Sequence, residues 1–93
     1  MTDATPDLRR KKLLHRARYR GFKEADILVG GFAEEALPGM AQGELDAFEA
    51  ILSANDHDIY AWVSGNVEPP AAIDAGLIAR MRKFDAVRKA QNP

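Results

Sequence analysis

Hydrophobic residues recur three or four positions apart along most of the chain, the spacing of amphipathic helices that bury one face. Glycines and prolines divide this pattern into five segments, and no segment shows the β-branched alternation typical of a strand. The sequence therefore predicts an all-α fold, a compact bundle of about five short helices. We expect the helices at about residues 6–20, 22–36, 42–53 and 56–64, with the last beginning at residue 71 or 74.

Local signals mark the predicted helix ends. Pro6 suits the first turn of a helix, because the amide hydrogen that it lacks would have no partner there. Gly21 is expected to end the first helix in the left-handed conformation that glycine adopts easily. Leu37–Gly39 would end the second helix, Asp56 would cap the fourth and Gly65 would terminate it.

One face of each predicted helix should enter a common core. The expected members are Leu13, Leu14, Ala17, Phe22, Ala25, Leu28 or Val29, Phe32, Ala36, Leu45, Phe48, Ile51, Leu52, Ile59, Trp62, Val63, Ile73, Leu77, Met81, Phe84 and Val87. Gly30 and Gly31 interrupt the second helix, where two glycines cost about 2 kcal/mol relative to alanine. Either the helix bends there or another segment packs closely against the bare backbone, and we favour the packing role.

A chain of 93 residues is long enough for one helical domain, expected to span residues 1–93 with frayed ends at 1–5 and 90–93. The absence of cysteine excludes disulfides and thiolate metal sites. The sequence has neither an apolar run of the ~20 residues that a membrane span needs nor a secretory signal pattern. We therefore expect a cytoplasmic protein that does not associate with membranes.

The net charge of −1 conceals a strong segregation of charge along the chain. Residues 1–24 hold eight Lys/Arg and three acids, residues 25–79 hold ten acids and no Lys/Arg, and residues 80–93 hold five Lys/Arg and one acid. The basic first helix is interpreted as a solvated face, a surface for a protein partner or a nucleic-acid-binding surface. The acidic middle argues against the last, because it would repel phosphates over much of the surface.

Side chains suited to catalysis or metal binding are sparse. The two histidines, His15 and His57, lie far apart in the sequence, and the acids beside His57 are explained by the favourable field at a helix N-terminus. Neither serine has a nearby histidine and acid to activate it, and the glycine pair lacks the rest of a phosphate-binding motif. We expect no enzyme, no metal site and no tightly bound cofactor.

The expected turn between the first two helices holds residues that a turn alone does not require. Gly21 fits a tight turn, and Glu24 would place its carboxylate over the free N–H groups of the second helix. Phe22 and Asp26 have no such local role. Together with Arg20 they would form a protruding edge for a partner protein, because arginine and aromatic residues supply much of the binding energy in interfaces.

These residues also carry a resemblance to a known family. The segments concerned are Arg20-Gly21-x-x-Glu24, KKLL at 11–14 before it, Asp26 and FAEE at 32–35 after it, and DHDIYAWVSG at 56–65 with EPP at 68–70. In this order and spacing, over about residues 10–84, they resemble the succinate dehydrogenase assembly factor family. The five-residue motif alone would be a weak signal, whereas the two separated segments together are specific.

The resemblance implies a five-helix bundle that has no catalytic activity of its own. Family members bind the flavoprotein subunit of succinate dehydrogenase, or in some bacteria of fumarate reductase, and promote covalent attachment of FAD to that subunit. The FAD would thus belong to the partner. Carried over to this chain, Arg20, Gly21 and Glu24 would face the partner, with Phe22 and Asp26 beside them.

Two other functions stay open on the sequence alone: a small basic-helix nucleic-acid-binding protein, and a regulatory, antitoxin-like bundle with a different protein target. The first would lose affinity steeply with added salt. The second would bind its target regardless of the state of any flavin. Without a partner, the protein is expected to be a monomer or a weak dimer.

Overall fold

The computed structural model describes residues 6–91, which form five α-helices, one short 3-10 helix and no strand. The elements are α1 (Pro6–Arg18), α2 (Lys23–Ala36), η1 (Leu37–Gly39), α3 (Gln42–Leu52), α4 (Asp56–Ser64) and α5 (Ala75–Gln91). The predicted all-α bundle is confirmed. Of the ends expected to be frayed, 1–5 and 92–93 lie outside the described residues, whereas Ala90 and Gln91 belong to α5.

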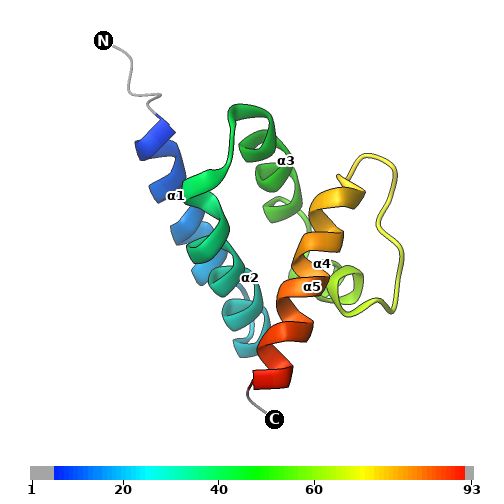
Figure 1. The fold of residues 1–93 in the computed structure, drawn as a ribbon. Helices are drawn as coiled ribbons and strands as arrows, with labels where there is room; N and C mark the ends of the chain where they lie inside the picture. The colour runs from blue at the N-terminus through cyan, green and yellow to red at the C-terminus, as the bar shows by residue number, and fades with distance from the viewer. Residues whose placement is uncertain (1–5, 92–93) are drawn as a thin grey trace.

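Helix α2 is the central element of the bundle. It lies beside α1 and also contacts α4 and α5, while α1 also contacts α3 (Figure 1). The long connection between α4 and α5 runs around one side of the molecule. No helix within the described part of the chain combines the length and apolar character needed to cross a bilayer.

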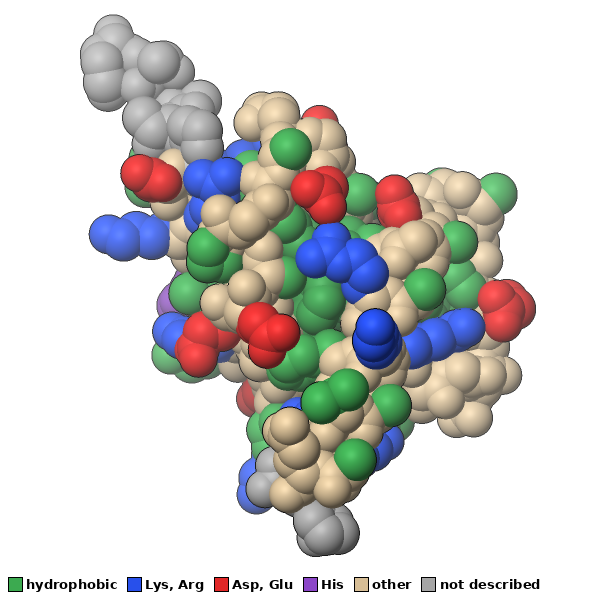
Figure 2. Space-filling model, in the orientation of Figure 1, with side chains coloured by type: hydrophobic (Ala, Val, Ile, Leu, Met, Phe, Trp, Pro, Cys, Tyr) green, Lys and Arg blue, Asp and Glu red, His purple; other side chains and the backbone are tan. Residues whose placement is uncertain are grey.

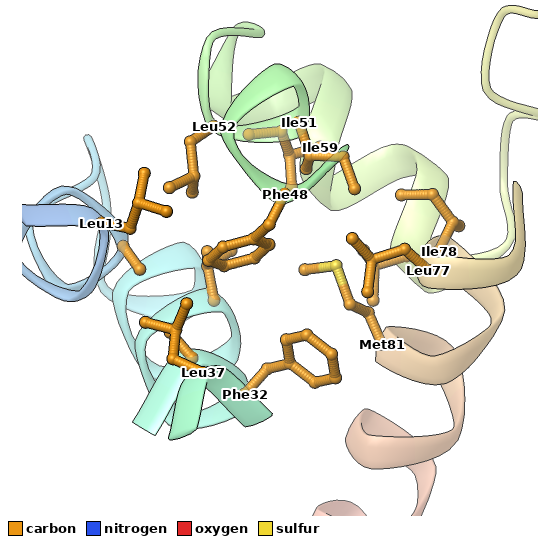
Figure 3. Close-up of a cluster of buried hydrophobic side chains, with 14 of the residues drawn as sticks. Leu13, Phe32, Leu37, Phe48, Ile51, Leu52, Ile59, Leu77, Ile78 and Met81 are labelled. Carbon is orange, nitrogen blue, oxygen red and sulfur yellow. The ribbon is translucent and has the colours of Figure 1, made fainter. Parts of the chain in front are cut away.

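The core gathers around Phe48, which α3 directs toward side chains from all the other α-helices (Figure 3). Its buried members are Leu13, Ala17, Leu28, Val29, Phe32, Ala33, Leu37, Met40, Leu45, Phe48, Ile51, Leu52, Ile59, Trp62, Val63, Leu77, Ile78 and Met81. Val87 was expected among them, but 48% of it is exposed. It lines an open groove between α2 and α5.

The glycine pair in α2 allows close packing on two sides, as predicted. A Cβ atom on Gly30 would lie 3.2 Å from the Cα atom of Arg18, so α1 packs against bare backbone there. A Cβ atom on Gly31 would lie 3.2 Å from Cζ of Phe84, whose ring approaches from α5. Close contact with α1 and α5 therefore offsets the low helix propensity of the two glycines.

The helix ends differ from the predictions at two places. Asp56 is not the cap of α4, because Asn55 holds that position and accepts a hydrogen bond from the His57 amide at 2.8 Å. Helix α1 ends at Arg18, and Gly21 does not adopt the left-handed conformation. Gly65 does, with φ of 87°, and ends α4 as predicted.

Replacing Gly30 with leucine should lower the free energy of unfolding by about 1–3 kcal/mol, because the added side chain would push α1 away from α2. Gly43→Leu in α3 is the matched control, since a Cβ atom there has nothing within 4 Å. Urea denaturation followed by circular dichroism measures both. Equal losses in the two variants would show that the close approach at Gly30 does not determine stability.

Candidate partner-binding site

The predicted site lies at the corner where the chain turns from α1 into α2, formed by residues 19–22 and the first turn of α2 as far as Asp26. Phe22 is the N-cap residue of α2, with an extended backbone, and its carbonyl accepts the Asp26 amide at 3.0 Å. The Asp26 carboxylate turns back and accepts the Arg20 amide at 2.6 Å. Asp26 therefore closes the corner from within and is only half-exposed.

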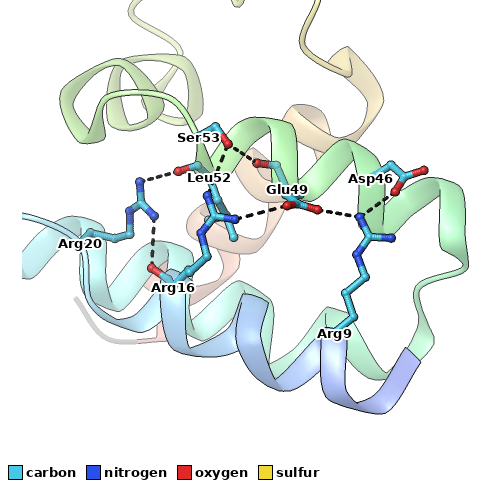
Figure 4. A network of polar contacts seen from close by, with 7 residues as sticks. All are labelled: Arg9, Arg16, Arg20, Asp46, Glu49, Leu52 and Ser53. Carbon is cyan, nitrogen blue, oxygen red and sulfur yellow. Dashed lines mark hydrogen bonds and ion pairs between the residues drawn. The ribbon is translucent and has the colours of Figure 1, made fainter. Parts of the chain in front are cut away.

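Arg20 does not protrude as the sequence suggested, because its side chain is turned into the protein and is only 10% exposed. Its Nε donates to Oδ1 of Asp56 at 2.7 Å. Its Nη2 donates to the Leu52 carbonyl at 2.9 Å, and its Nη1 donates to the Arg16 carbonyl at 3.2 Å (Figure 4). One guanidinium group thus joins the α1–α2 corner to the end of α3 and the start of α4.

A side chain at position 21 would collide with the side chain of Asp56. A Cβ atom at this position would lie 2.6 Å from Oδ2 of Asp56, the carboxylate that pairs with Arg20. Any other residue would force this carboxylate to move. Gly21 itself is exposed, so the same feature leaves its backbone accessible at the surface.

An aromatic cluster joins the corner to α4. The Phe22 ring stacks on His57, with centroids 4.8 Å apart and planes inclined by 13°, and it meets Tyr60 edge-on at 5.7 Å. Phe22 is half-buried in this cluster against α4 and does not join the hydrophobic core, where its helical spacing had placed it. Sequence reasoning did not include His57, Tyr60 or Asp56 in the site, although all three lie in the segment 56–65 that carries the second part of the resemblance.

Glu24 is the exposed acid of the corner. It lies in the first turn of α2, where the helix dipole favours a carboxylate. The capping contact expected from the sequence is not formed, since no other residue between 6 and 91 makes a hydrogen bond or ion pair with this carboxylate. Glu24 is therefore available to a partner in a way that Arg20 and Asp26 are not.

The arginines of α1 are largely paired within the protein. Arg9 contacts Asp46 at 2.6 Å and Glu49 at 2.7 Å (Figure 4), and these contacts raise its pKa, the Glu49 hydrogen bond most. Arg16 also approaches Glu49, and Arg18 pairs with Glu34. The basic and acidic blocks of the sequence therefore largely neutralise each other, which leaves a reduced positive field for nucleic acid.

Comparison with known proteins gives a family match over most of the chain. Residues 11–85 match the model of a family described as "flavinator of succinate dehydrogenase". Proteins named "succinate dehydrogenase assembly factor 2, mitochondrial" are 43% identical in Candida glabrata over 60 residues, 31% in Saccharomyces cerevisiae over 87 and 32% in Caenorhabditis briggsae over 81. These alignments include 64%, 89% and 84% of this chain.

The chain spans only 39%, 54% and 66% of the length of these three relatives. All three relatives are named as mitochondrial proteins. The expectation of a cytoplasmic protein is therefore wrong, because the names point to the mitochondrion instead.

The steric account of Gly21 predicts a coupling between two positions 35 places apart in numbering, Gly21 and Asp56. Gly21→Ala should cost about 1–2 kcal/mol of stability in the wild-type background, because the new methyl group displaces the carboxylate. In an Asp56→Ala background the same change should cost close to nothing, although Asp56→Ala is itself destabilising by about 2 kcal/mol. The double-mutant cycle is measured by urea denaturation, and an equal cost of Gly21→Ala in both backgrounds would contradict the account.

Proposed function

Because the chain belongs to the family described as flavinators of succinate dehydrogenase, we propose that it is an assembly factor that binds the flavoprotein subunit of that enzyme. It would promote covalent attachment of FAD to the subunit without catalytic activity of its own. The match over residues 11–85 is the observation that carries this proposal. The names of the relatives support it, since they describe assembly factors.

The corner between α1 and α2 is the proposed contact surface. Gly21 would let the partner approach the backbone closely, and the exposed Glu24 would pair with a cation or an N–H group of the partner. Arg20 and Asp26 would act as positioning residues, because their polar groups are already engaged within the corner. Phe22 would supply apolar contact at the edge of the site.

The proposed effect on the partner is a shift of its conformational equilibrium. A small rigid bundle that binds one arrangement of the flavoprotein more tightly than others favours that arrangement by its difference in affinity. The FAD would be held by the partner, with no cofactor bound tightly by this chain. We propose a one-to-one complex with a monomeric bundle, and the flavoprotein subunit of fumarate reductase as a second candidate partner.

Replacing Glu24 with alanine tests the corner as an interface. Because no contact within residues 6–91 depends on this carboxylate, stability should change by less than about 0.5 kcal/mol. Affinity for the purified succinate dehydrogenase flavoprotein subunit should fall by about tenfold or more, the loss expected for a charge-assisted hydrogen bond. Isothermal titration calorimetry measures the affinity.

Glu68→Ala is the matched control, since this carboxylate is 84% exposed and lies in the α4–α5 connection. It removes the same charge at a distance from the corner. Equal affinities of the Glu24→Ala and wild-type proteins would refute the role of Glu24. Failure of the wild-type protein to bind the subunit at all would refute the proposed function.

A further inference from the structure

A groove of about 730 Å³ runs between α2 and α5. Its α2 wall is formed by Phe32, Glu35 and Ala36. Its α5 wall is formed by Arg80, Lys83, Phe84, Val87, Arg88 and Gln91. None of these residues belongs to the corner, so the groove is a separate feature of the surface.

The floor of the groove is formed by two packed aromatic rings. Phe32 is only 4% exposed and meets Phe84 edge-on, with centroids 5.8 Å apart. The Phe84 ring in turn rests against the backbone of Gly31. Val87 adds an exposed aliphatic side chain beside the rings, so the groove offers apolar contact that water covers in the free protein.

Cations line the α5 side of the groove. Figure 2 shows Lys and Arg side chains along α5 with hydrophobic surface between them and the acidic side chains over α2. Arg80 lies over the Phe32 ring at 5.8 Å and pairs with Glu44, and Arg88 pairs with Asp85. Lys83 is exposed and has no ion pair with any residue from 6 to 91. Of the three cations that line the groove, Arg80 and Arg88 are paired, so Lys83 supplies the uncompensated positive charge of this wall.

We propose that this groove binds an acidic segment of the partner protein that carries one aromatic or aliphatic anchor. The anchor would pack on Phe32 and Phe84, and acidic side chains would face Lys83 on α5. Glu35 on the opposite wall would exclude acids from the α2 side, which sets the orientation of the segment. The identification of this partner as the flavoprotein subunit rests on the proposed function.

The chemistry of the groove is tested first with two model peptides, acetylated and amidated EEWLEE and KKWLKK, which share an anchor and differ in charge. The ¹⁵N-labelled full chain is titrated with each. EEWLEE should shift amide resonances of residues 32–36 and 80–91, and Lys83→Glu should abolish these shifts. Equal effects of both peptides, shifts confined to other elements, or no shifts with EEWLEE would overturn the proposal.

The role of the groove in the complex is tested with the flavoprotein subunit. Lys83→Glu and Val87→Ser should each weaken its binding by about tenfold at low salt, with folding checked by circular dichroism. The double variant Asn66→Asp/Val67→Asp in the exposed α4–α5 connection makes the same change in net charge and should leave the affinity within about twofold. An equal loss in this double variant would show a general effect of net charge and overturn the groove as the contact.

The two proposals fail in different ways. If Glu24→Ala weakens binding but Lys83→Glu and Val87→Ser do not, the groove proposal is overturned and the proposed function stands. If the wild-type chain does not bind the flavoprotein subunit, the proposed function fails, and the peptide titration decides the groove by itself. A dimer by sedimentation that Lys83→Glu dissociates would assign the groove to a second copy of the chain and overturn the partner segment.

Discussion

The contact between Arg20 and Asp56 is the constraint on which the candidate site depends. A guanidinium group that is only 10% exposed must have a partner, because an unpaired charge in such a place is strongly destabilising. Asp56 supplies one carboxylate oxygen to Arg20, and its other oxygen occupies the space that a Cβ atom at Gly21 would need. A side chain at position 21 would displace this carboxylate from its place beside Arg20, so the pair favours glycine at the corner.

The same contact explains how residues from separate helices form one surface. Arg20 also donates to the Leu52 carbonyl, so the corner, the end of α3 and the start of α4 are held together. This arrangement brings Phe22 of the corner against His57 of α4. Glu24 then lies exposed on the first turn of α2. The two segments that carry the family resemblance thus meet in space through a partly buried ion pair and an aromatic stack.

The basic and acidic segments of the sequence form ion pairs with each other in the fold. Arginines of α1 pair with acids of α2 and α3, through contacts such as Arg9 with Glu49 and Arg18 with Glu34. Exposed pairs of this kind add little stability individually. They offset the charges of Arg9, Arg16 and Arg18. Glu24 and Lys83 are exposed and have no ion pair among residues 6–91.

Helices and core were predictable because their periodicity is local. The spacing of apolar residues located all five helices, and the glycine pair indicated close packing before its partners were known. The direction of the Arg20 side chain was not predictable, because the group that decides it, Asp56, lies on another helix and no local pattern links the two. Asp56 was predicted to be the N-cap because an acid in the first turn and an acid at the N-cap look alike in sequence.

The position of Val87 shows a related limit of periodicity. The spacing that places Met81 in the core continues to Val87, yet the exposed fractions are 0% and 48%. A helical pattern identifies a face but not how far along that face the neighbouring helices extend. The open groove between α2 and α5 is therefore visible only in the structure.

The central claim is that this corner enables a flavoprotein partner to acquire covalent FAD. The most direct measurement is the fluorescence of flavin that stays attached to the denatured succinate dehydrogenase flavoprotein subunit, in cells with and without the gene for this protein. The account predicts a loss of signal on deletion, recovery with the wild-type gene and no recovery with Gly21→Arg at equal protein level. An undiminished signal in the deletion cells, or full recovery with Gly21→Arg, would contradict it.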